Sequence, residues 1–433
     1  MTDGAPLLTP TATTIDRDPM SLGTQTAGLR PTRVGILTHT AVADDPRVRR
    51  QIEAFGDAGW DVVAVGTEGG RSSPPDAHLD LAPARPADRS IAGRLHRLSV
   101  LSVSKVAPFT ADRMFWLLPE QYGDFLKRAR RYQPDLWIAN DWTMLPVATA
   151  LVRERPAPVL YDSHEFAYDE FPENWKWRIF VRPLVRKLEA EGISRVGAVT
   201  CVSAGIARRL QAVYGLQDEP TVVRNMPRYE DVPFRACGED IKVLYHGIVT
   251  PNRGLEQIIR SLSLWRPQFT LAIRGPADGS YLSALKALAE AEGVAGRVRF
   301  EPPVPLVRLV QAAADHDVGI FVLPAHSQQN EFVLPNKLFE YAMAGLCLCV
   351  SDLPEMAAVV RTNDLGRLID GTSPERIAAA VNSLDRASID RAKVRSLTAA
   401  RDMCWERERE KLLAIASRLV SDARSPAALR HGH

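Results

Sequence analysis

The chain of 433 residues lacks an apolar run of the roughly 18 residues that a membrane-spanning helix needs. It also lacks an excess of charge, since 54 basic residues oppose 52 acidic ones and the net charge is only +2. A protein that binds nucleic acid through its bulk charge would be strongly basic. No charged start followed by an apolar stretch marks a secretory signal. We therefore expect a cytoplasmic protein without a nucleic-acid partner.

Cysteines are also few. The five of them are odd in number and show no paired spacing, which argues against a disulfide framework. Cys347 and Cys349 alternate within an apolar run and would face the same side of a strand, but no second cysteine or histidine pair completes a metal site. We expect both to be buried as small apolar side chains, as free cysteines usually are.

Short apolar runs alternate with helical patterns along most of the chain, which is typical of parallel α/β architecture. One segment, 220–239, holds three prolines and shows no period, so it is predicted to link two domains. The pattern predicts two doubly wound, Rossmann-like domains that face an interdomain cleft, with ligands at the carboxyl ends of the strands. The expected strands are Val34–Leu37, Asp61–Val65, Leu136–Ala139, Val159–Tyr161 and Ala198–Val202, then Val243–Tyr245, Thr270–Arg274, Val298–Phe300, Val318–Val322 and Leu346–Val350. Residues 1–30 and the tail 422–433 are polar and without period, and we expect them to be disordered or flexible.

In the second half, the residues from Leu334 to Gly345 read LPNKLFEYAMAG. Pro335 suits the first turn of a helix, and Gly345 suits its end. Free backbone N–H groups at that N-terminus would attract a phosphate, and Lys337 adds a positive charge. Glu340 lies on roughly the same face, where a carboxylate could take two ribose hydroxyls. The alternative is an ordinary helix with a surface lysine and glutamate.

The loop that follows Tyr245 contains Gly247 and carries Arg253 at the start of the next helix. A glycine-containing crossing from strand to helix with an arginine is a candidate clamp for a pyrophosphate. The loop lacks the G-x-G-x-x-G fingerprint, which counts against a nicotinamide or flavin enzyme.

In the first half, polar residues follow two expected strands. The string YDSHEF places Asp162, His164 and Glu165 at the carboxyl end of one strand, and Asp141 follows another. A lone histidine is more often structural than catalytic, but the flanking carboxylates and the placement leave both interpretations open.

The loop after the first strand contains Asp45, Pro46 and Arg47. Asp45 is a good N-cap with Pro46 at the first helical position. Capping explains Asp45, but it does not explain why Arg47 follows at the side of the cleft.

Together these strings resemble the GT-B-fold glycosyltransferases of family 4, the large group of retaining transferases, from about Arg33 to Val420. Their order and spacing agree with the family. The strings are DPRVRR at Asp45–Arg50, DSHE at Asp162–Glu165, VVRNMP at Val222–Pro227, the Tyr245–Gly254 loop and LPNKLFEYAMAG at Leu334–Gly345.

The resemblance implies a hexosyltransferase-type enzyme that moves a sugar, with retention, from a nucleotide-diphosphate sugar to a hydroxyl acceptor on a glycan, a lipid-linked molecule or a small natural product. Residues 31–235 would form the acceptor-side domain, with a helix over 405–421 crossing back onto it, and 236–404 would bind the nucleotide sugar. The donor-binding residues would be Gly247, Arg253, Asn336, Lys337, Leu338 and Glu340. The catalytic residues would be His164, Arg253 and Lys337, and Asp45, Arg47, Asp141 and Glu165 would lie on the acceptor side.

The departing diphosphate collects negative charge, which either a metal ion or cationic side chains must stabilise. No Asp-x-Asp sequence suggests a metal site, so we expect Arg253 and Lys337 to act without a metal or cofactor. Two departures from the family pattern stand out. Glu331 and Glu340 are separated by eight residues where the family often has seven, and Ile248 stands where many members have an arginine.

Two rival functions remain at this point. A nucleotide-sugar epimerase or hydrolase of the same fold would turn over its substrate without an acceptor. A catalytically silent partner subunit of a glycosylation complex would bind the nucleotide sugar without transfer.

Peripheral contact with the inner face of a membrane is a further interpretation, because basic and apolar residues are interspersed between Arg94 and Arg131. A solvated face over a buried core explains the same pattern, and the sequence favours this simpler explanation.

Overall fold

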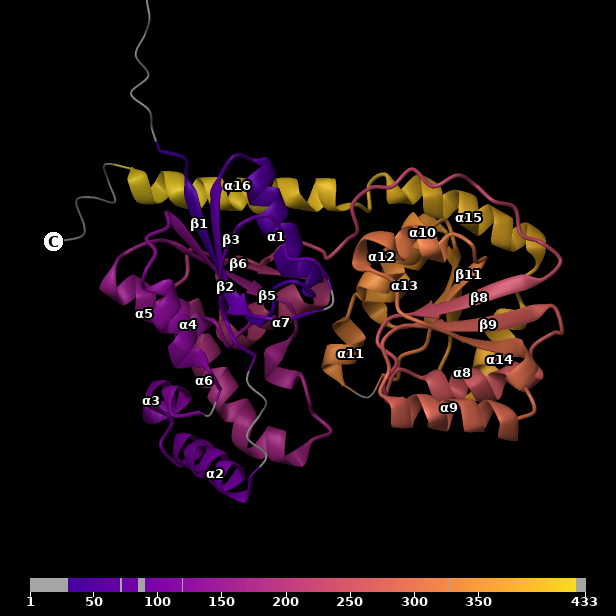
Figure 1. The fold of residues 1–433 in the computed structure, drawn as a ribbon, viewed down its shortest axis with the longest axis horizontal. Helices are drawn as coiled ribbons and strands as arrows, with labels where there is room; N and C mark the ends of the chain where they lie inside the picture. Colours follow the sequence, from indigo (N-terminus) through magenta and orange to yellow (C-terminus); the bar gives the residue numbers. More distant parts are fainter. Residues whose placement is uncertain (1–29, 71, 85–89, 119, 326, 426–433) are drawn as a thin grey trace, which may run out of the picture. The chain divides into compact units, whose positions relative to one another are not determined.

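Two parallel sheets, one in each half of the chain, form the frame of the structure (Figure 1). The structure is a computed structural model and describes residues 30–425 apart from 71, 85–89, 119 and 326. Residues 1–29 and 426–433, which cover almost all of the two segments expected to lack order, lie outside the described residues. The described elements belong to one unit, 32–433.

The first sheet has the strand order β3-β2-β1-β4-β5-β6-β7, and every pairing in it is parallel. Its strands are β1 (Arg33–Ala41), β2 (Asp61–Thr67), β3 (His78–Ala82), β4 (Leu136–Asn140), β5 (Val159–Ser163), β6 (Ala198–Cys201) and β7 (Thr221–Val222). The second sheet has the order β10-β9-β8-β11-β12-β13, also parallel. Its strands are β8 (Ile241–His246), β9 (Phe269–Arg274), β10 (Val298–Glu301), β11 (Val318–Phe321), β12 (Cys347–Ser351) and β13 (Gly366–Ile369).

All ten predicted strands are confirmed, within one to four residues at their ends. Three strands were missed, namely β3, β7 and β13. Each lies at the edge of its sheet, where a strand is short or only partly buried and therefore lacks a continuous apolar run. The segment 220–239 is thus not all linker, because β7 pairs with β6 before the chain leaves the first sheet.

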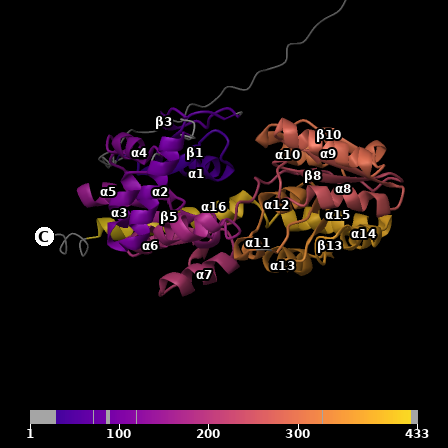
Figure 2. The same cartoon turned by 90° about the horizontal axis from the view of Figure 1, so that it is seen from below.

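Helices cover both faces of the first sheet (Figures 1 and 2). The helices of this half are α1 (Pro46–Asp57), α2 (Ile91–Val106), α3 (Ala111–Trp116), α4 (Tyr122–Ala129), α5 (Leu145–Glu154), α6 (Arg182–Ile193) and α7 (Ala204–Tyr214), joined by α16 (Trp405–Arg424). Successive residues of β1 point to opposite faces, so Ile36 packs with α1 and α16 whereas Leu37 packs with α4, α5 and α6.

Helix α16 comes from the far end of the chain and lies on the first sheet (Figure 1). Trp405 and Leu412 are completely buried there in one cluster with Val34 and Leu136. The helix continues through Arg424, so it extends into the segment from 422 that was expected to be a flexible tail.

The second sheet is likewise covered on both faces, by α8 (Leu255–Ser261), α9 (Gly279–Ala291) and α14 (Pro374–Asn382) on one side and by α10 (Leu309–Ala313), α12 (Asn336–Met343) and α15 (Arg386–Ala400) on the other (Figures 1 and 2). The short α11 (Gln328–Phe332) precedes α12, and α13 (Pro354–Asn363) follows β12.

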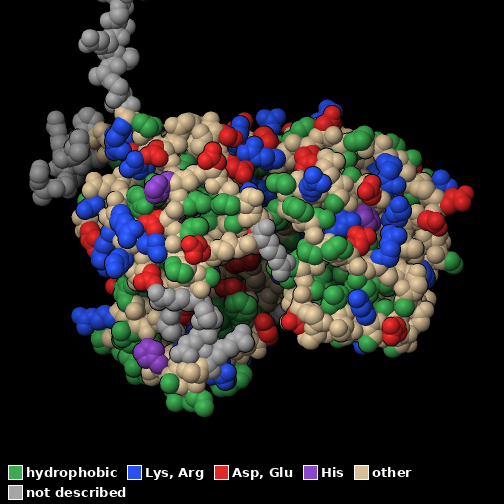
Figure 3. All heavy atoms as spheres, in the orientation of Figure 1, with side chains coloured by type: hydrophobic (Ala, Val, Ile, Leu, Met, Phe, Trp, Pro, Cys, Tyr) green, Lys and Arg blue, Asp and Glu red, His purple; other side chains and the backbone are tan. Residues whose placement is uncertain are grey.

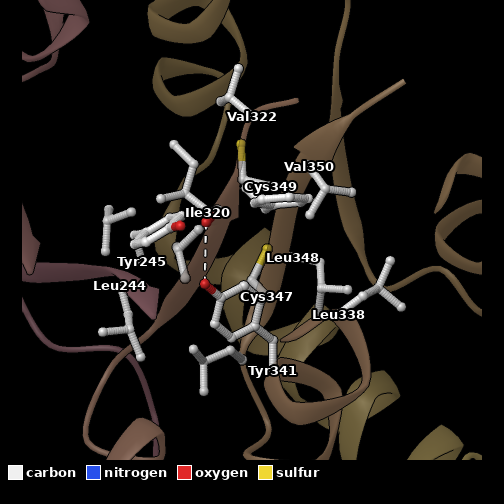
Figure 4. Packing of buried hydrophobic residues seen from close by; sticks show 14 of the residues in the cluster. Leu244, Tyr245, Ile320, Val322, Leu338, Tyr341, Cys347, Leu348, Cys349 and Val350 are labelled. Atoms are coloured by element: carbon white, nitrogen blue, oxygen red, sulfur yellow. Dashed lines mark hydrogen bonds between the residues drawn. The ribbon is translucent and has the colours of Figure 1, made fainter. Parts of the chain in front are cut away.

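Part of the core of this half lies between α12 and the sheet (Figure 4). The Tyr341 hydroxyl donates a hydrogen bond to the carbonyl oxygen of Ile320 at 3.2 Å and accepts one from the backbone N–H of His246. Cys347 and Cys349 are free and completely buried, as predicted.

Three hydrogen bonds join the two halves near α11 and α13. The backbone N–H of Phe166 donates to Gln329 Oε1 at 2.7 Å, and the Ser203 hydroxyl donates to the Phe332 carbonyl at 2.7 Å. The backbone N–H of Gly205 donates to Glu355 Oε1 at 2.6 Å. A side chain at position 205 would collide with Phe332, so a glycine permits this close approach.

Candidate active site

Lys337 lies in the first turn of α12 with its ammonium group against two aromatic rings. Nζ is 4.1 Å from the ring centroid of Phe321 and 4.8 Å from that of Tyr245. Among the residues that the structure describes, none forms a hydrogen bond or an ion pair with this ammonium group. Burial and the charge of Arg253 lower the pKa of Lys337 to about 7, against the attraction of Glu340. An anion would restore the charge of this lysine.

The start of α12 is open toward the same place. Pro335 is the N-cap, one position before the first turn in which it was predicted, and no side chain caps the helix there. Asn336 and Lys337 therefore present backbone N–H groups that no described residue accepts from. This arrangement suits a phosphate, which helix N-termini attract.

Gly247 brings the loop after β8 against the lysine. Its φ is 124°, and a Cβ added there would lie 3.1 Å from Lys337 Nζ. Gly247 also contacts Gly275 closely, because a Cβ on the latter would stand 1.9 Å from the Gly247 carbonyl oxygen. Only glycine combines this backbone conformation with the space that the ammonium group occupies.

Arg253 stands in the same loop, directly before Gly254, which is the N-cap of α8. The guanidinium is half-buried and makes no hydrogen bond or ion pair to any described residue. Its charge contributes to the lowered pKa of Lys337, so the two cations repel each other. A bound dianion would remove that repulsion.

Glu340 is buried, and its carboxylate lies beside a histidine that sequence reasoning did not single out. His246 ends β8, its Nε2 is 2.9 Å from Glu340 Oε2, and its ring stacks on Tyr341 at 4.7 Å between centroids. Burial alone would raise the pKa of Glu340, but His246 and, less strongly, Arg50 and Lys337 lower it. The carboxylate is therefore ionised. The sequence did offer one feature that could have identified His246, namely its position at the carboxyl end of a strand.

Leu338 does not fit its predicted part in donor binding. The side chain is 1% exposed and packs in the core of the second half (Figure 4). Its backbone N–H is also occupied, since it donates to the Pro335 carbonyl at 3.0 Å. The sequence pattern could not separate Leu338 from Lys337, because neighbours on an α-helix point in directions only about 100° apart and the pattern does not say which of them faces the core.

In the first half, His164 lies among three polar side chains at the carboxyl ends of β4 and β5. Its Nε2 is 2.9 Å from Asn140 Oδ1 and 3.3 Å from Asp162 Oδ2, and its Nδ1 is 3.5 Å from Asp141 Oδ2. Burial alone would lower the pKa of His164, but Asp141 and Asp162 outweigh it and raise the pKa to about 9. The imidazole is therefore protonated at neutral pH, and it serves as a cation in the resting protein.

Arg47 was predicted to lie on the acceptor side, but its guanidinium is buried and hydrogen-bonded to other residues of the first half, so it does not face an acceptor. Its Nε and Nη2 donate to Asp162 at 2.8 and 2.7 Å, and Nη1 donates to the Val223 carbonyl at 2.5 Å. Gln51 and Thr200 also donate to Asp162. Burial alone would raise the pKa of Asp162, but Arg47 and His164 hold it well below its usual range. This ion pair joins α1 to strand β5 of the sheet. Asp162 also contacts His164, so the pair supports the histidine from the side of the core.

Asp45 caps α1 as predicted, accepting from the backbone N–H groups of Arg47 and Val48 at 2.9 and 3.1 Å. Its second oxygen accepts from the Thr40 hydroxyl. Asp141 and Glu165 line a separate cavity of about 260 Å³ in the first half. Asp141 has a φ of 62°, a conformation that few residues other than glycine adopt.

A second cavity, of about 470 Å³, is lined by residues of both halves. The first half contributes Tyr168, Asp169, Pro172, Arg182 and Arg209, and the second contributes Ala325, Ser327 and Glu331. Glu331 thus faces a cleft between the halves, whereas Ile248 is 63% exposed and supplies no charge beside Gly247.

Within the described ranges, no group of three or more His, Cys, Asp or Glu side chains could hold a metal ion. An Asp-x-Asp sequence does occur at Asp315–Asp317, but it comes directly before β11 (Val318–Phe321), at the opposite end of the strand from the site. Asp317 is also bound by Lys393 and Arg235, each at 3.0 Å.

Two parallel sheets covered by helices, with the candidate residues at the carboxyl ends of their strands, define the two-domain GT-B fold. Two solved structures show the likeness. Sucrose-phosphate synthase from Thermosynechococcus elongatus matches with a TM-score of 0.70 and 14% identity, over 90% of this chain and all of that one. The Anabaena protein HepE in complex with UDP and glucose matches with a TM-score of 0.66 and 14% identity, over 89% of this chain and all of that one.

Family models match both halves. The glycosyl transferase 4-like domain matches residues 45–226, and the glycosyl transferases group 1 model matches residues 232–398. The chain belongs to glycosyltransferase family 4. It is 27% identical over 248 residues to a D-inositol 3-phosphate glycosyltransferase of Acidothermus cellulolyticus, covering 52% of this chain and 54% of that protein. The corresponding enzyme of Nocardia farcinica is 28% identical over 254 residues, covering 53% and 55%. The match spans about half the length of these curated relatives.

Proposed function

We propose that the protein transfers a sugar, with retention and without a metal ion, from a nucleotide-diphosphate sugar to a hydroxyl acceptor. The observation that carries the proposal is the ammonium group of Lys337. It is enclosed by aromatic rings, has no ion-pair partner in the described chain and lies near a second cation, Arg253. Such a site favours a ligand with two or more negative charges.

In the proposed reaction, the bond between the sugar C1 and the diphosphate oxygen breaks, and the bonding electrons leave with the diphosphate. Arg253, Lys337 and the open N-terminus of α12 stabilise this charge. The acceptor oxygen bonds to C1 from the face that the diphosphate leaves, and its proton departs with the diphosphate. The positive charge on the imidazole excludes His164 as a base, since its ring is already protonated at neutral pH. His164 instead contacts sugar hydroxyls and orients the transferred ring.

The comparisons support a nucleotide sugar as the donor. The Anabaena protein HepE is known with UDP and glucose and also with UDP-glucose. The curated relatives are named for glycosyl transfer to a phosphorylated inositol. Glu340 would then accept hydrogen bonds from the ribose hydroxyls through the oxygen that His246 leaves free.

The test is a panel of nucleotide sugars, measured for thermal stabilisation of the protein and for slow donor hydrolysis, with and without EDTA. A bound donor raises stability in proportion to its affinity. We expect one donor to stabilise and to be hydrolysed at the same rate in EDTA, and the transferred sugar to keep its anomeric configuration by NMR. Loss of turnover in EDTA with recovery on adding magnesium would exclude the metal-free mechanism. Sugar epimerisation without an acceptor, or binding without any turnover, would favour the two rival functions.

A second proposal concerns α2 and a membrane surface. Large apolar residues at helical spacing are exposed on one side of α2, namely Ile91, Leu95, Leu98 and Val106 at 78%, 61%, 44% and 85%. The opposite side packs on the protein through Gly93, Val100 and Ser104. Arg94 and Lys105 flank the exposed stripe. Figure 3 shows hydrophobic and basic side chains together at the lower left, where α2 and α3 lie in Figure 1.

A helix that buries one face in the protein and exposes apolar residues next to cations suits the interface of an anionic bilayer. No helix among the described residues has the length and apolar character to cross a membrane. We expect the protein to co-sediment with vesicles that contain phosphatidylglycerol and not with pure phosphatidylcholine vesicles. The double variant Leu95→Ser with Leu98→Ser should no longer co-sediment with these vesicles. Leu264→Ser, at an exposed site in the second half, should co-sediment as the wild-type protein does. Equal binding of all variants would contradict the proposal.

A further inference from the structure

The cavity of about 260 Å³ in the first half has a charge and a lining that indicate what it binds. Three carboxylates line it, those of Asp141, Glu165 and Glu170. Three aromatic rings do so as well, those of Trp142, Phe171 and Trp177. The cavity is smaller than the roughly 300–1,000 Å³ of sites for drug-sized ligands, so it suits a small molecule.

The cavity adjoins the reacting centre proposed above. Asp141 lines it and also places Oδ2 at 3.5 Å from His164 Nδ1. Glu165 follows His164 directly in the chain. A hydroxyl group held by these carboxylates would therefore lie next to the side chain that we place at the transferred sugar.

The cavity disfavours a negatively charged ligand. Glu170 is half-buried, and burial together with the nearby Glu165 and Asp141 raises its pKa to about 8, while burial and Asp141 raise the pKa of Glu165 to about 7. Glu170 is thus mostly protonated at neutral pH, because a further negative charge is costly in this cavity. The positive groups nearby already have partners. The Arg97 guanidinium forms an ion pair with Glu120, and the charge of His164 faces Asp141 and Asp162. His39 is the remaining basic side chain of the lining, and its Nδ1 lies 2.9 Å from the Thr143 hydroxyl.

Carboxylates next to aromatic rings are the side chains that suit an uncharged polyol. Carboxylate oxygens accept strong hydrogen bonds from hydroxyl groups, and aromatic rings pack against the apolar C–H face of a sugar ring. Phe171 and Trp177 meet edge to face with centroids 6.0 Å apart, which forms a corner for such a ring. A phosphate group placed here would instead meet three carboxylates and no unpaired cation.

We propose that this cavity is the acceptor subsite and that it selects an uncharged polyol, such as the ring of a sugar, against a phosphorylated one. The inference rests on the proposed glycosyl transfer and names its acceptor class. The selection comes from the cost of a further negative charge beside these carboxyl groups and from the lack of an unpaired cation for a phosphate, so a cation introduced at position 170 changes it.

The test compares matched acceptors with the donor that the panel identifies. Glucose is paired with glucose 6-phosphate, and myo-inositol with myo-inositol 3-phosphate. The measured quantity is nucleotide release above the rate without an acceptor. We expect at least one uncharged member to be preferred about tenfold or more over its phosphorylated counterpart, because like charges brought together in an interface cost several kcal/mol.

Two pairs of variants isolate the cavity from the surrounding segment. Glu170→Lys should narrow the preference or reverse it, whereas Glu173→Lys, an exposed glutamate three residues away, should leave it unchanged. Phe171→Ala should raise the KM for the uncharged acceptor, whereas Trp175→Ala, which is 55% exposed, should not. Saturation-transfer NMR with myo-inositol measures binding to the cavity without a donor, and Phe171→Ala should weaken its signal.

A wild-type preference for the phosphorylated acceptors would overturn the inference, as would identical behaviour of the two lysine variants. Failure of every acceptor to accelerate nucleotide release would do the same. In each case donor stabilisation and hydrolysis would persist, so the proposed donor chemistry would stand. Absence of any donor binding, with myo-inositol still binding in the NMR experiment, would instead contradict the proposed function and leave the cavity as a polyol site.

Discussion

His246 Nε2 and Glu340 Oε2 lie 2.9 Å apart and join the carboxyl end of β8 to helix α12. The two residues are 94 positions apart in the chain, and both side chains are buried. The contact orients the carboxylate and leaves its second oxygen for a ligand. In the proposed function, this contact would hold the ribose of a donor at a fixed place relative to Lys337, which lies one turn earlier on α12.

Glu340→Gln should weaken the binding of the donor more than it slows the bound-state reaction. The ribose is remote from the breaking bond, so its hydrogen bonds contribute similarly to the ground state and the transition state. The expected loss of binding free energy is about 1.5–3 kcal/mol, the usual range for hydrogen bonds to a charged group. Isothermal titration with the donor and a kcat measurement separate the two effects. Normal donor affinity with a collapsed kcat would move Glu340 to the reacting centre.

Lys337→Ala and Arg253→Ala should each lower turnover strongly and leave the fold intact. Each variant removes a charge that stabilises the departing diphosphate, which we expect to cost on the order of 2–4 kcal/mol in the activation free energy, as for lost oxyanion donors. Single-turnover rates with the identified donor provide the measurement, and circular dichroism checks the fold. Rates close to wild type in both variants would refute the assignment of the diphosphate site.

Donor affinity should fall as the pH rises above about 7. The pKa of Lys337 is about 7, lowered by burial and by Arg253, and the protonated form is the one that binds an anion. Above this pH, binding requires proton uptake, and the dissociation constant rises by at most about tenfold per pH unit. A nucleotide-diphosphate sugar is the appropriate probe because its phosphates are fully esterified and do not titrate here.

The matched variant for this pH dependence is Lys337→Arg. A guanidinium stays protonated throughout the range, so its donor affinity should be nearly independent of pH between 6 and about 9. A wild-type protein with the same flat profile would show that Lys337 does not titrate at the donor.

His164→Ala should slow transfer and hardly change nucleotide affinity. His164 follows β5 of the first sheet, whereas Arg253, Lys337 and Glu340 follow strands of the second. Free UDP and GDP provide the control, since neither carries a sugar for the imidazole to touch. If the variant loses affinity for the free nucleotide, His164 belongs to the nucleotide pocket, and if nothing changes it is a structural residue.

Asp162→Asn should lower the free energy of unfolding by about 3–5 kcal/mol, because it leaves the buried Arg47 guanidinium without its charge partner. The control is Asp61→Asn, which breaks the half-exposed pair with Arg33 and should cost about 0–1 kcal/mol. Urea unfolding measures both. Equal losses in the two variants would contradict the structural role of the Arg47–Asp162 pair.

The same pair predicts how stability depends on acid. The folded-state pKa of Asp162 lies well below its usual range, so its contribution is fully present above the unfolded value of about 4 and is lost as the pH falls below it. Asp162→Asn should therefore have a shallower loss of stability between pH 4 and about 2 than the wild-type protein.

Local rules recovered much of this protein from its sequence. Alternating apolar runs located the central strands of both sheets, because a strand buried on both faces must be apolar whatever its neighbours are. Capping and helix-end preferences located the start of α1 at Asp45 and the end of α12 before Gly345, since they depend on residues within one turn. The resemblance to family 4 came from strings of the same local kind.

Which polar side chains remain available to bind a ligand depends on contacts in the folded protein. Arg47 and Asp162 are 115 residues apart and neutralise each other in the core, although their strings resembled parts of an active site. His246 belongs to the candidate site because it contacts Glu340. Leu338 does not fit its predicted part in donor binding, because its side chain faces the core. Burial and ion pairing arise from segments that are distant in the chain, so no local pattern contains them. Local sequence patterns were thus enough to locate the central strands, several helix ends and the family, whereas the unpaired charges depend on contacts between distant segments.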